Sequence, residues 1–242
     1  MRIGRLHGVG VGPGDPELLT VKAARVIAEA PVVAFFAKAG RRGNARGIVD
    51  RWLKPSHVEL PLYYPMTTES HFDDPPYREA LKLFYAESVS AIAAHLDGGR
   101  DVALLSEGDP LFYGSFMHLF VRLRERFAVT IVPGVSSICG GWGAAATAMT
   151  WGDDSLVVLP ATLPLEELTR RLSLADAAVI MKIGRNFSRA KQALAEAGMA
   201  ERAIYVERAT MEGEQVMPLC AKSDGAAPYF SMILVPGRGR RP

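Results

Sequence analysis

Cysteines and long apolar runs are what the sequence has least of. Among 242 residues there are two cysteines, Cys139 and Cys220, which form neither a disulfide framework nor a CxxC metal motif. So low a cysteine content favours a reducing compartment. No uninterrupted apolar run approaches the ~20 residues that a membrane-spanning helix requires. The N-terminus leads into a glycine-rich turn instead of a signal-peptide core. We therefore expect a cytoplasmic protein that binds no membrane and holds no metal of its own.

Two common nucleotide-binding motifs are also missing. A small-residue strand at residues 6–11 runs into a glycine-rich turn at residues 12–15, and a helical pattern follows. The third glycine of the dinucleotide motif would fall at position 13 or 15, which are Pro13 and Asp15. No Gly-Lys-Ser/Thr follows the turn, so it is not a P-loop. The sequence therefore argues against an NAD or ATP protein.

Strand-length apolar runs alternate with helical patterns in the first half of the chain. The strands expected there lie at residues 6–11, 32–36, 57–60 and 102–105. This alternation predicts a mostly parallel sheet with crossover helices. The strands expected later lie at residues 129–132, 156–159, 178–183, 203–206, 215–219 and 229–235, the last two as an antiparallel pair. We predict an α/β fold of two domains, residues 1–125 with the mostly parallel sheet and residues 126–242 with a mixed sheet.

The stretch SEGDP at residues 106–110 ends the buried run at 102–105 and precedes a helical pattern. In open α/β sheets, small ligands bind at the carboxyl ends of the strands. Gly108 lets a ligand approach the backbone, and Pro110 keeps Asp109 out of the helical conformation. Asp109 is also a good helix cap, but capping alone requires neither the glycine nor the proline. We interpret the stretch as a ligand loop.

Charge is nearly balanced overall, because 28 basic residues face 26 acidic ones and the formal net charge is +2. This balance gives no support for nucleic-acid binding. Basic residues nevertheless gather in one short segment, which contains Lys38, Arg41, Arg42, Arg46, Arg51 and Lys54. Two interpretations stay open: a solvated helix and loop surface, or the mouth of a site for a polyanionic ligand.

Several motifs, in a fixed order, resemble those of one family. They are GVGPGDPELLT at residues 10–20, EGDPLFYGS at 107–115, VPGVSS at 132–137, MKIGR at 181–185 and VERATM at 206–211. With them the chain resembles the tetrapyrrole methyltransferases of cobalamin and sirohaem synthesis over nearly its whole length. Within that family it looks most like the precorrin-2 C(20)-methyltransferases. The motifs typical of that branch are YYPMTT, SEGDPLFYGSFMHL, LPAT, VIMKIGR and APYFSMILV.

The resemblance implies two α/β domains with S-adenosyl-L-methionine in the cleft between them, in a homodimer that meets neighbouring pathway enzymes transiently. By motif matching, the implied cofactor contacts are Pro13, Glu107, Gly108, Asp109, Phe112, Ser136, Ser137, Met181 and Ala209. Two positions depart from the family pattern. Glu107 and Ala209 both stand where other branches often have glycine. The first adds a charge beside the cofactor, and the second adds a methyl group near the implied adenine wall.

The implied reaction moves a methyl group from S-adenosyl-L-methionine to carbon 20 of precorrin-2, giving precorrin-3A and S-adenosyl-L-homocysteine. A sulfonium methyl group is already activated, so alignment and exclusion of water supply much of the acceleration. This agrees with the lack of a Ser/His/Asp or Cys/His constellation. An acceptor rich in carboxylates requires arginine and lysine. The implied substrate residues are Lys38, Arg41, Arg42, Arg46 and Arg185.

Three questions stay open from the sequence. The base that removes the proton at carbon 20 is His71, Glu107, a tyrosine or solvent. The acceptor is metal-free precorrin-2, which SEGDPLFYGSFMHL and YYPMTT favour, or its cobalt complex. More distant hypotheses are an RNA methyltransferase of the same fold and a non-enzymatic protein that binds S-adenosyl-L-methionine. The basic cluster is too local for the first, and intact motifs in both halves argue against the second.

Overall fold

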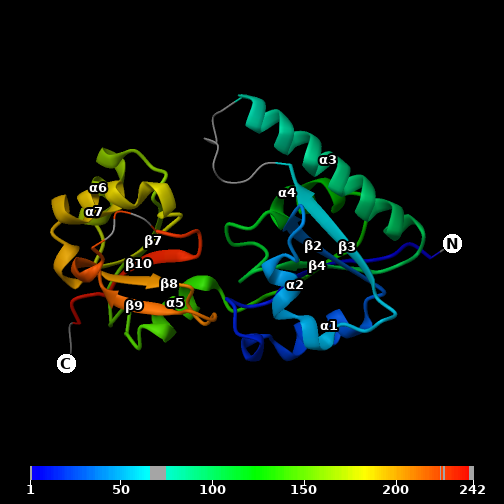
Figure 1. Ribbon diagram of the computed structural model, residues 1–242, viewed down its shortest axis with the longest axis horizontal. Coiled ribbons are helices and arrows are strands. Elements are labelled where there is room, and N and C mark those ends of the chain that lie inside the picture. The colour runs from blue at the N-terminus through cyan, green and yellow to red at the C-terminus, as the bar shows by residue number, and fades with distance from the viewer. Residues whose placement is uncertain (1, 66–74, 224, 226, 240–242) are drawn as a thin grey trace. The chain divides into compact units, whose positions relative to one another are not determined.

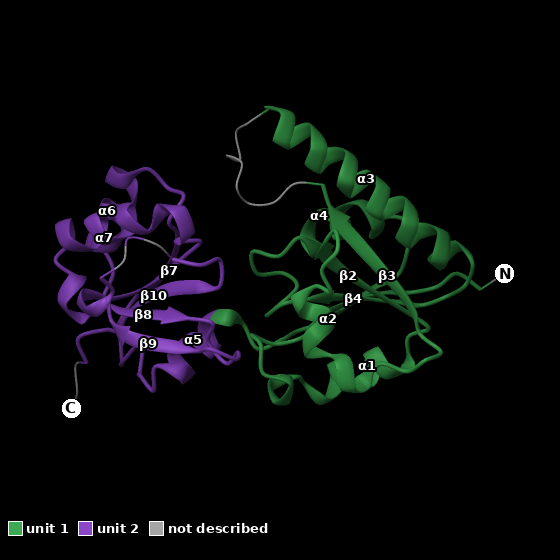
Figure 2. Ribbon diagram, in the orientation of Figure 1, with its two compact units in different colours: residues 1–137 green, residues 138–242 purple. Residues whose placement is uncertain are grey.

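The chain folds into two compact units. The computed structural model describes residues 2–65, 75–223, 225 and 227–239 (Figure 1). The units comprise residues 1–137 and residues 138–242 (Figure 2). Each is built around a five-stranded sheet. In the described part of the chain, no helix is long and apolar enough to cross a membrane.

The sheet of the first unit is entirely parallel. Its strands are β1 (Leu6–Gly10), β2 (Val32–Lys38), β3 (Val58–Tyr64), β4 (Val102–Ser106) and β5 (Val129–Val132), in the order β3-β2-β4-β1-β5. The central strand β4 is buried along its whole length, as expected for a parallel sheet covered on both faces. Pro61 lies in the edge strand β3, where its missing N–H is tolerated. Because all five strands are parallel, the loops that follow them leave the sheet at one edge.

Helices cover both faces of this sheet. They are α1 (Val21–Glu29), α2 (Asn44–Ile48), α3 (Pro75–Asp97) and α4 (Phe116–Leu123), with short 3-10 turns at Pro16–Leu18 and Asp50–Trp52. Successive residues of β4 point to opposite faces, which divides the apolar core into two layers. Leu104 packs in the cluster that includes Ile92 of α3, and Leu105 packs in the cluster that includes Ile27 of α1.

The sheet of the second unit is mixed. Its strands are β6 (Leu156–Pro160), β7 (Ala177–Met181), β8 (Ile204–Glu207), β9 (Gln215–Pro218) and β10 (Ser231–Val235), in the order β6-β7-β10-β8-β9. β6 and β7 are parallel, whereas β10 runs antiparallel to both β7 and β8. These two sheets confirm the predicted α/β fold, with a mostly parallel first sheet and a mixed second sheet.

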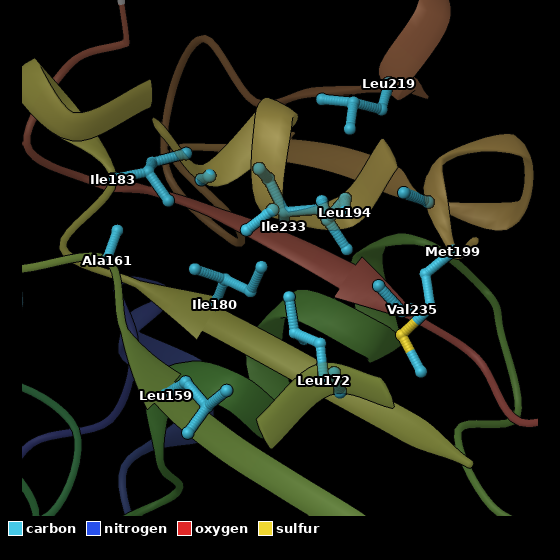
Figure 3. Packing of buried hydrophobic residues seen from close by; sticks show 14 of the residues in the cluster. Leu159, Ala161, Leu172, Ile180, Ile183, Leu194, Met199, Leu219, Ile233 and Val235 are labelled. Atoms are coloured by element: carbon cyan, nitrogen blue, oxygen red, sulfur yellow. The ribbon is translucent and has the colours of Figure 1, made fainter. Parts of the chain in front are cut away.

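The helices of the second unit are α5 (Ser137–Ala144), α6 (Leu165–Ser173) and α7 (Phe187–Glu196), with 3-10 turns at Gly184–Asn186, Ala200–Arg202 and Leu219–Ala221. One face of the sheet packs against α6 and α7. Figure 3 shows this layer, in which Leu172 of α6 and Leu194 of α7 lie over Ile180 and Ile233 of the sheet. The strand ends are therefore held by a rigid apolar core.

Two sequence-based expectations about strand placement are wrong. Residues 129–132 do not open the second unit, because β5 pairs in parallel with β1, and the first unit extends to residue 137 instead of 125. The last two strands do not pair with each other, because β8 lies between β9 and β10. In both cases burial decides. β1 is apolar and needs a neighbour on each side, and every residue of β10 is buried, which suits an interior position.

Candidate functional site

Three strand-end loops meet at the carboxyl edge of the first sheet, because they follow the neighbouring strands β4, β1 and β5. Gly108 N–H donates to the carbonyl oxygen of Gly12 at 2.8 Å, and Gly12 N–H donates back to Gly108 at 3.4 Å. The carboxylate of Asp109 accepts from Gly134 N–H at 3.1 Å. We call this linked set the strand-end junction; it comprises residues 10–14, 107–114 and 133–137.

Glycine is required at the junction because the backbones crowd one another. A Cβ atom on Gly134 would lie 2.1 Å from the carbonyl oxygen of Gly108, and one on Gly10 would lie 2.5 Å from Gly134 N. Neither distance is compatible with a side chain. Gly108 also has φ +64°, a conformation that residues with a Cβ rarely adopt. Glycine at these positions therefore lets the three loops pack backbone against backbone.

Asp109 holds the junction together. Its Oδ1 accepts from Leu111 N–H at 2.9 Å, and its Oδ2 accepts from Gly134 N–H. Both carboxylate oxygens are thus bound to backbone, and they fix the loop. Asp109 does not cap a helix, because α4 begins at Phe116 with Ser115 as its N-cap. Phe112 follows in the same loop and meets the ring of Tyr113 edge-on, with 4.9 Å between ring centroids.

Glu107 directly follows β4 and begins the second segment of the junction. The residue keeps exposed surface, yet desolvation of its carboxyl group raises its pKa. Interactions with the backbone of Ala45 and the side chain of Asn44, at the start of α2, oppose that rise. A carboxyl group in this state is a better proton acceptor than an ordinary surface carboxylate.

The remaining predicted cofactor residues of the first unit also lie at the junction. Pro13 is buried next to Gly12. Ser136 and Ser137 are partly buried where α5 begins, close enough that a Cβ on Gly108 would meet Ser137 N at 3.3 Å. Hydroxyl groups and backbone N–H groups at a helix start are suited to polar and anionic parts of a ligand. The structure therefore brings the junction residues together around one sheet edge.

The two predicted cofactor residues of the second unit share one apolar cluster. Met181 ends β7 and packs against the cluster, and Ala209, which follows β8, is part of it. The loop after β8 has two non-glycine residues at positive φ, Arg208 at 52° and Thr210 at 62°. Hydrogen bonds hold this conformation: Arg208 Nε donates to Glu212 O at 2.6 Å and Thr210 N–H donates to the Glu214 carboxylate at 2.6 Å.

Four of the five predicted substrate residues are exposed. Lys38 is the last residue of β2 and Arg41 lies on the loop after it; neither forms an ion pair with another described residue. Arg42 is exposed but binds Asp50. Arg185 is exposed on the 3-10 turn that follows β7 in the second unit.

Arg46 differs, because its guanidinium is buried and occupied. Its Nε and Nη2 donate to the two oxygens of Glu59 at 2.6 and 2.8 Å, and its Nη1 donates to Asp50 at 2.8 Å. These bonds raise the pKa of Arg46 and lower the pKa values of Glu59 and Asp50. Three of the five N–H groups of Arg46 are thus bound within the protein, so Arg46 is less available to a ligand carboxylate than the four exposed basic residues.

Sequence reasoning missed a cluster of hydroxyl groups at the same sheet edge. Tyr64, the last residue of β3, is hydrogen-bonded to Ser115, and the Tyr85 hydroxyl interacts with both. Burial raises the pKa of Tyr85, whose ring stacks on His118 with 4.5 Å between centroids. The YYP motif gave a signal, because it places a tyrosine at a strand end. The other base candidate, His71, lies outside the described residues.

No cluster of three or more His, Cys, Asp or Glu side chains that could hold a metal ion occurs among the described residues. What the described residues offer is carboxylates, hydroxyls and bare backbone at the first sheet edge, an apolar wall in the second unit, and exposed cations. Such a set binds and orients polar ligands; it contains no nucleophile paired with a base.

Comparison with known proteins gives consistent matches. The family described as tetrapyrrole (corrin/porphyrin) methylases matches residues 5–221. A precorrin-2 C(20)-methyltransferase of Sinorhizobium sp is 55% identical and covers 99% of this chain and 98% of the relative. A cobalt-precorrin-2 C(20)-methyltransferase of Salmonella typhimurium is 32% identical and covers 96% of both chains. The solved structure of a uroporphyrin-III C-methyltransferase from Thermus thermophilus, complexed with S-adenosyl homocysteine, has a TM-score of 0.67 at 23% identity. It covers 96% of this chain and 92% of that chain, and shows the same fold.

Proposed function

The chain belongs to the tetrapyrrole (corrin/porphyrin) methylases, and from that premise we propose that it transfers a methyl group from S-adenosyl-L-methionine to carbon 20 of metal-free precorrin-2. The product is precorrin-3A, an intermediate of cobalamin biosynthesis. The observation that carries this proposal is the much higher identity with a precorrin-2 C(20)-methyltransferase than with a cobalt-precorrin-2 enzyme. The geometry supports it, because the junction offers carboxylates and hydroxyl groups that can position ligands.

S-adenosyl-L-methionine supplies an activated methyl group and offers hydroxyl, carboxylate, ammonium and adenine groups for recognition. The chain carries a complement for each class. Carboxylates and backbone groups of the junction accept hydrogen bonds from hydroxyl and ammonium groups, and serine hydroxyls bind a carboxylate. An apolar wall suits the adenine ring. The proposed cofactor residues are Pro13, Glu107, Gly108, Asp109, Phe112, Ser136, Ser137, Met181 and Ala209.

The acceptor is held through its carboxylates. Lys38, Arg41, Arg42 and Arg185 are the proposed partners, because all four are exposed. A charge-assisted hydrogen bond contributes about 1.5–3 kcal/mol when it is desolvated, and close to nothing when it stays in water. Their role is therefore to orient the macrocycle so that carbon 20 faces the methyl group in line.

Glu107 is the proposed acceptor of the proton that carbon 20 loses after methylation. It lies on the junction, and desolvation raises the pKa of its carboxyl group. A base whose pKa is closer to the operating pH accepts a proton more effectively than an ordinary carboxylate. Because Glu107 shares its loop with the proposed cofactor residues Gly108, Asp109 and Phe112, we propose proton removal close to the bound cofactor.

Assembly and location complete the proposal. The family resemblance implies a homodimer, and the low cysteine content favours the cytoplasm. The same resemblance implies transient contact with neighbouring pathway enzymes. Size-exclusion chromatography with light scattering measures the mass directly, and a monomer at micromolar concentration would contradict the dimer.

The second candidate substrate is the cobalt complex of precorrin-2, because a cobalt-precorrin-2 enzyme is also a full-length relative. Incubation with labelled S-adenosyl-L-methionine and each acceptor, followed by mass analysis of the pigment, separates the two. We expect kcat/KM to be at least about tenfold higher with the metal-free acceptor, equal to about 1.4 kcal/mol of transition-state discrimination. The reverse order would transfer the chain to the cobalt route, and no methylation of either would overturn the reaction.

A further inference from the structure

The turn at residues 109–114 carries the proposed cofactor residue Phe112, so the shape of this turn bears on ligand binding. Its first residue, Asp109, is fixed by Gly134 N–H, which donates to the carboxylate at 3.1 Å. The same carboxylate accepts from Leu111 N–H at 2.9 Å. These bonds fix the beginning of the turn and leave its far end to other contacts.

The middle of this turn contains a strained residue. Tyr113 has φ 54°, a left-handed conformation that is unfavourable for a residue with a side chain. Such a conformation persists only where the surrounding structure fixes it. Gly114 comes next, and a Cβ there would lie 3.3 Å from Pro110 O, so the turn is tightly closed. A closed turn with a strained residue requires that its second end be held as firmly as its first.

Ser115 follows the turn, and its hydroxyl is used in an unusual way. The residue is the N-cap of α4, yet its side chain makes no capping hydrogen bond. Serine is a preferred N-cap because its hydroxyl normally accepts from the first N–H groups of a helix. Here the Ser115 hydroxyl instead accepts a hydrogen bond from the hydroxyl of Tyr64, the last residue of β3. The far end of the turn is therefore tied to the sheet.

Tyr64 is held in place by aromatic packing. Its ring stacks on that of Phe36 in β2, with 5.6 Å between centroids, and meets that of Phe84 in α3 at 4.6 Å. Aromatic pairs at these separations attract each other beyond what their buried area provides, and a ring packed on a strand and a helix moves only with them. The Tyr64 hydroxyl is therefore a fixed donor at the carboxyl end of β3.

We propose that Tyr64 is a positioning residue for the turn at residues 109–114, acting through its hydrogen bond to Ser115. The Asp109 bonds hold one end of the turn and the Tyr64–Ser115 bond holds the other, so Phe112 stays at the junction. This inference rests on the proposed function, in which Phe112 meets the cofactor. It gives the tyrosine at the end of β3 a task without any contact with a ligand.

The first test measures the turn itself and requires no ligand. Amide hydrogen exchange is followed by NMR in the wild type and in Tyr64→Phe, which keeps the ring and removes the donor. The reporter is Phe112 N–H, which donates to Asp109 O at 3.3 Å. We expect it to exchange about threefold to tenfold faster, the factor that one neutral hydrogen bond produces. The amides of β4, which is buried along its whole length, should keep their rates, whereas a general loss of stability would accelerate them too.

Two further variants make the result specific. Tyr63→Phe removes the hydroxyl of the preceding residue, which is 51% exposed and points to the opposite face of β3, and it should leave the exchange of Phe112 unchanged. Ser115→Ala removes the acceptor and no helix cap, so it should accelerate exchange as much as Tyr64→Phe does. The double variant should show no further acceleration, because both changes break the same bond.

The positioning role is overturned if Phe112 exchanges at the wild-type rate in either folded single variant. It is also overturned if the two effects add in full in the double variant, because the residues then act separately. Ser115→Ala alone decides the question if Tyr64→Phe does not fold.

Cofactor affinity separates this inference from the proposed function. If Phe112 meets the cofactor, calorimetric titration with S-adenosyl-L-homocysteine should show an affinity about threefold to tenfold lower in Tyr64→Phe, equal to about 0.7–1.4 kcal/mol. Tyr63→Phe should keep the wild-type affinity. Faster exchange with unchanged affinity would support the positioning role and remove the turn from the cofactor site. Unchanged exchange would overturn the positioning role even in a protein that binds S-adenosyl-L-homocysteine.

Discussion

The two units differ in how they build their strand-end loops. At the carboxyl edge of the first sheet, glycines occupy most of the special positions: Gly12 and Gly108 have positive φ, and Gly10 and Gly134 allow close backbone approach. Tyr113, at φ 54°, is the one described residue of this unit that combines a side chain with positive φ. At the strand ends of the second sheet, Lys182, Arg208 and Thr210 all do so. The second unit therefore holds more of this backbone strain.

Crowding explains the difference. In the first unit, three loops touch through their backbones, and a single methyl group would displace one of them. In the second unit, side chains of the loop after β8 bond to its own backbone: Arg208 Nε donates to Glu212 O, and the Glu214 carboxylate accepts from Thr210 N–H. A left-handed conformation costs a non-glycine residue roughly 1–2 kcal/mol, and local hydrogen bonds of about 1 kcal/mol each can offset it. Glycine is thus needed only where no room exists for a side chain.

The largest effect is expected from a substitution that disrupts the crowded junction. Gly134→Ala places a Cβ 2.1 Å from the carbonyl oxygen of Gly108, so backbone must move. We expect a loss of more than about 3 kcal/mol in the free energy of unfolding of the first unit. Trp52 is the only tryptophan of that unit, so its fluorescence in a Trp142→Phe/Trp151→Phe background reports urea unfolding there.

Gly143→Ala is the matched control from the second unit. Gly143 lies in α5 with nothing within 4 Å of its would-be Cβ. Because alanine favours the helix over glycine, this change should stabilise by about 0.5–1 kcal/mol. If Gly134→Ala and Gly143→Ala change the free energy of unfolding of their own units by the same amount, the junction is not crowded.

The second effect concerns Gly108 and the proposed cofactor. Gly108→Val combines backbone strain at φ +64° with a Cβ 3.3 Å from Ser137 N, so it displaces the start of α5. We expect a destabilisation of about 2 kcal/mol from the left-handed conformation. The affinity for S-adenosyl-L-homocysteine, measured by calorimetric titration, should fall at least about tenfold.

Gly198→Val separates the two causes. Gly198 has φ +67° and nothing within 4 Å of its would-be Cβ, so this change adds the same strain in the second unit without a collision. Its stability should fall by a similar amount while its affinity for S-adenosyl-L-homocysteine stays unchanged. Undiminished affinity in Gly108→Val would remove Gly108 from the cofactor site.

The sequence was enough to predict the features that depend on local pattern and on parallel strand topology. Alternation of strands and helices predicted the first sheet, and the positions of the glycine-rich turn and SEGDP at strand ends placed both loops at one edge. The crowding at Gly10 and Gly134 could not be predicted from the sequence, because it depends on how closely neighbouring loops approach each other. The sheet to which residues 129–132 belong was mispredicted for a similar reason: an apolar run indicates a strand and does not identify its partner.

Polar contacts between residues distant in the sequence could not be predicted either. Arg46 looked like its basic neighbours in the sequence, and only Glu59, placed by β3, distinguishes it. The interactions of Ala45 and Asn44 that oppose the raised pKa of Glu107 likewise join segments that are distant in the chain. A charge cluster in a sequence indicates where cations gather, but its buried members are decided by which carboxylates the fold brings to them.

The smallest expected effect relieves strain in the second unit. Ala146 follows α5 with φ 48° and is exposed. Its N–H donates to Gly143 O at 3.0 Å and Thr147 N–H donates to Trp142 O at 3.1 Å, which is the helix-ending pattern that favours glycine at this position. Ala146→Gly should therefore stabilise the second unit by about 0.5–1 kcal/mol, the left-handed strain less the entropy that glycine adds to the unfolded chain. The neighbour Ala145 has no positive φ and packs against the apolar cluster, so Ala145→Gly should destabilise by a similar amount. Urea unfolding followed by Trp142 and Trp151 fluorescence in a Trp52→Phe background measures both. If both variants lose stability equally, the second unit stores no strain at this turn, and the contrast with the glycine junction of the first unit would be confined to Lys182 and the loop after β8.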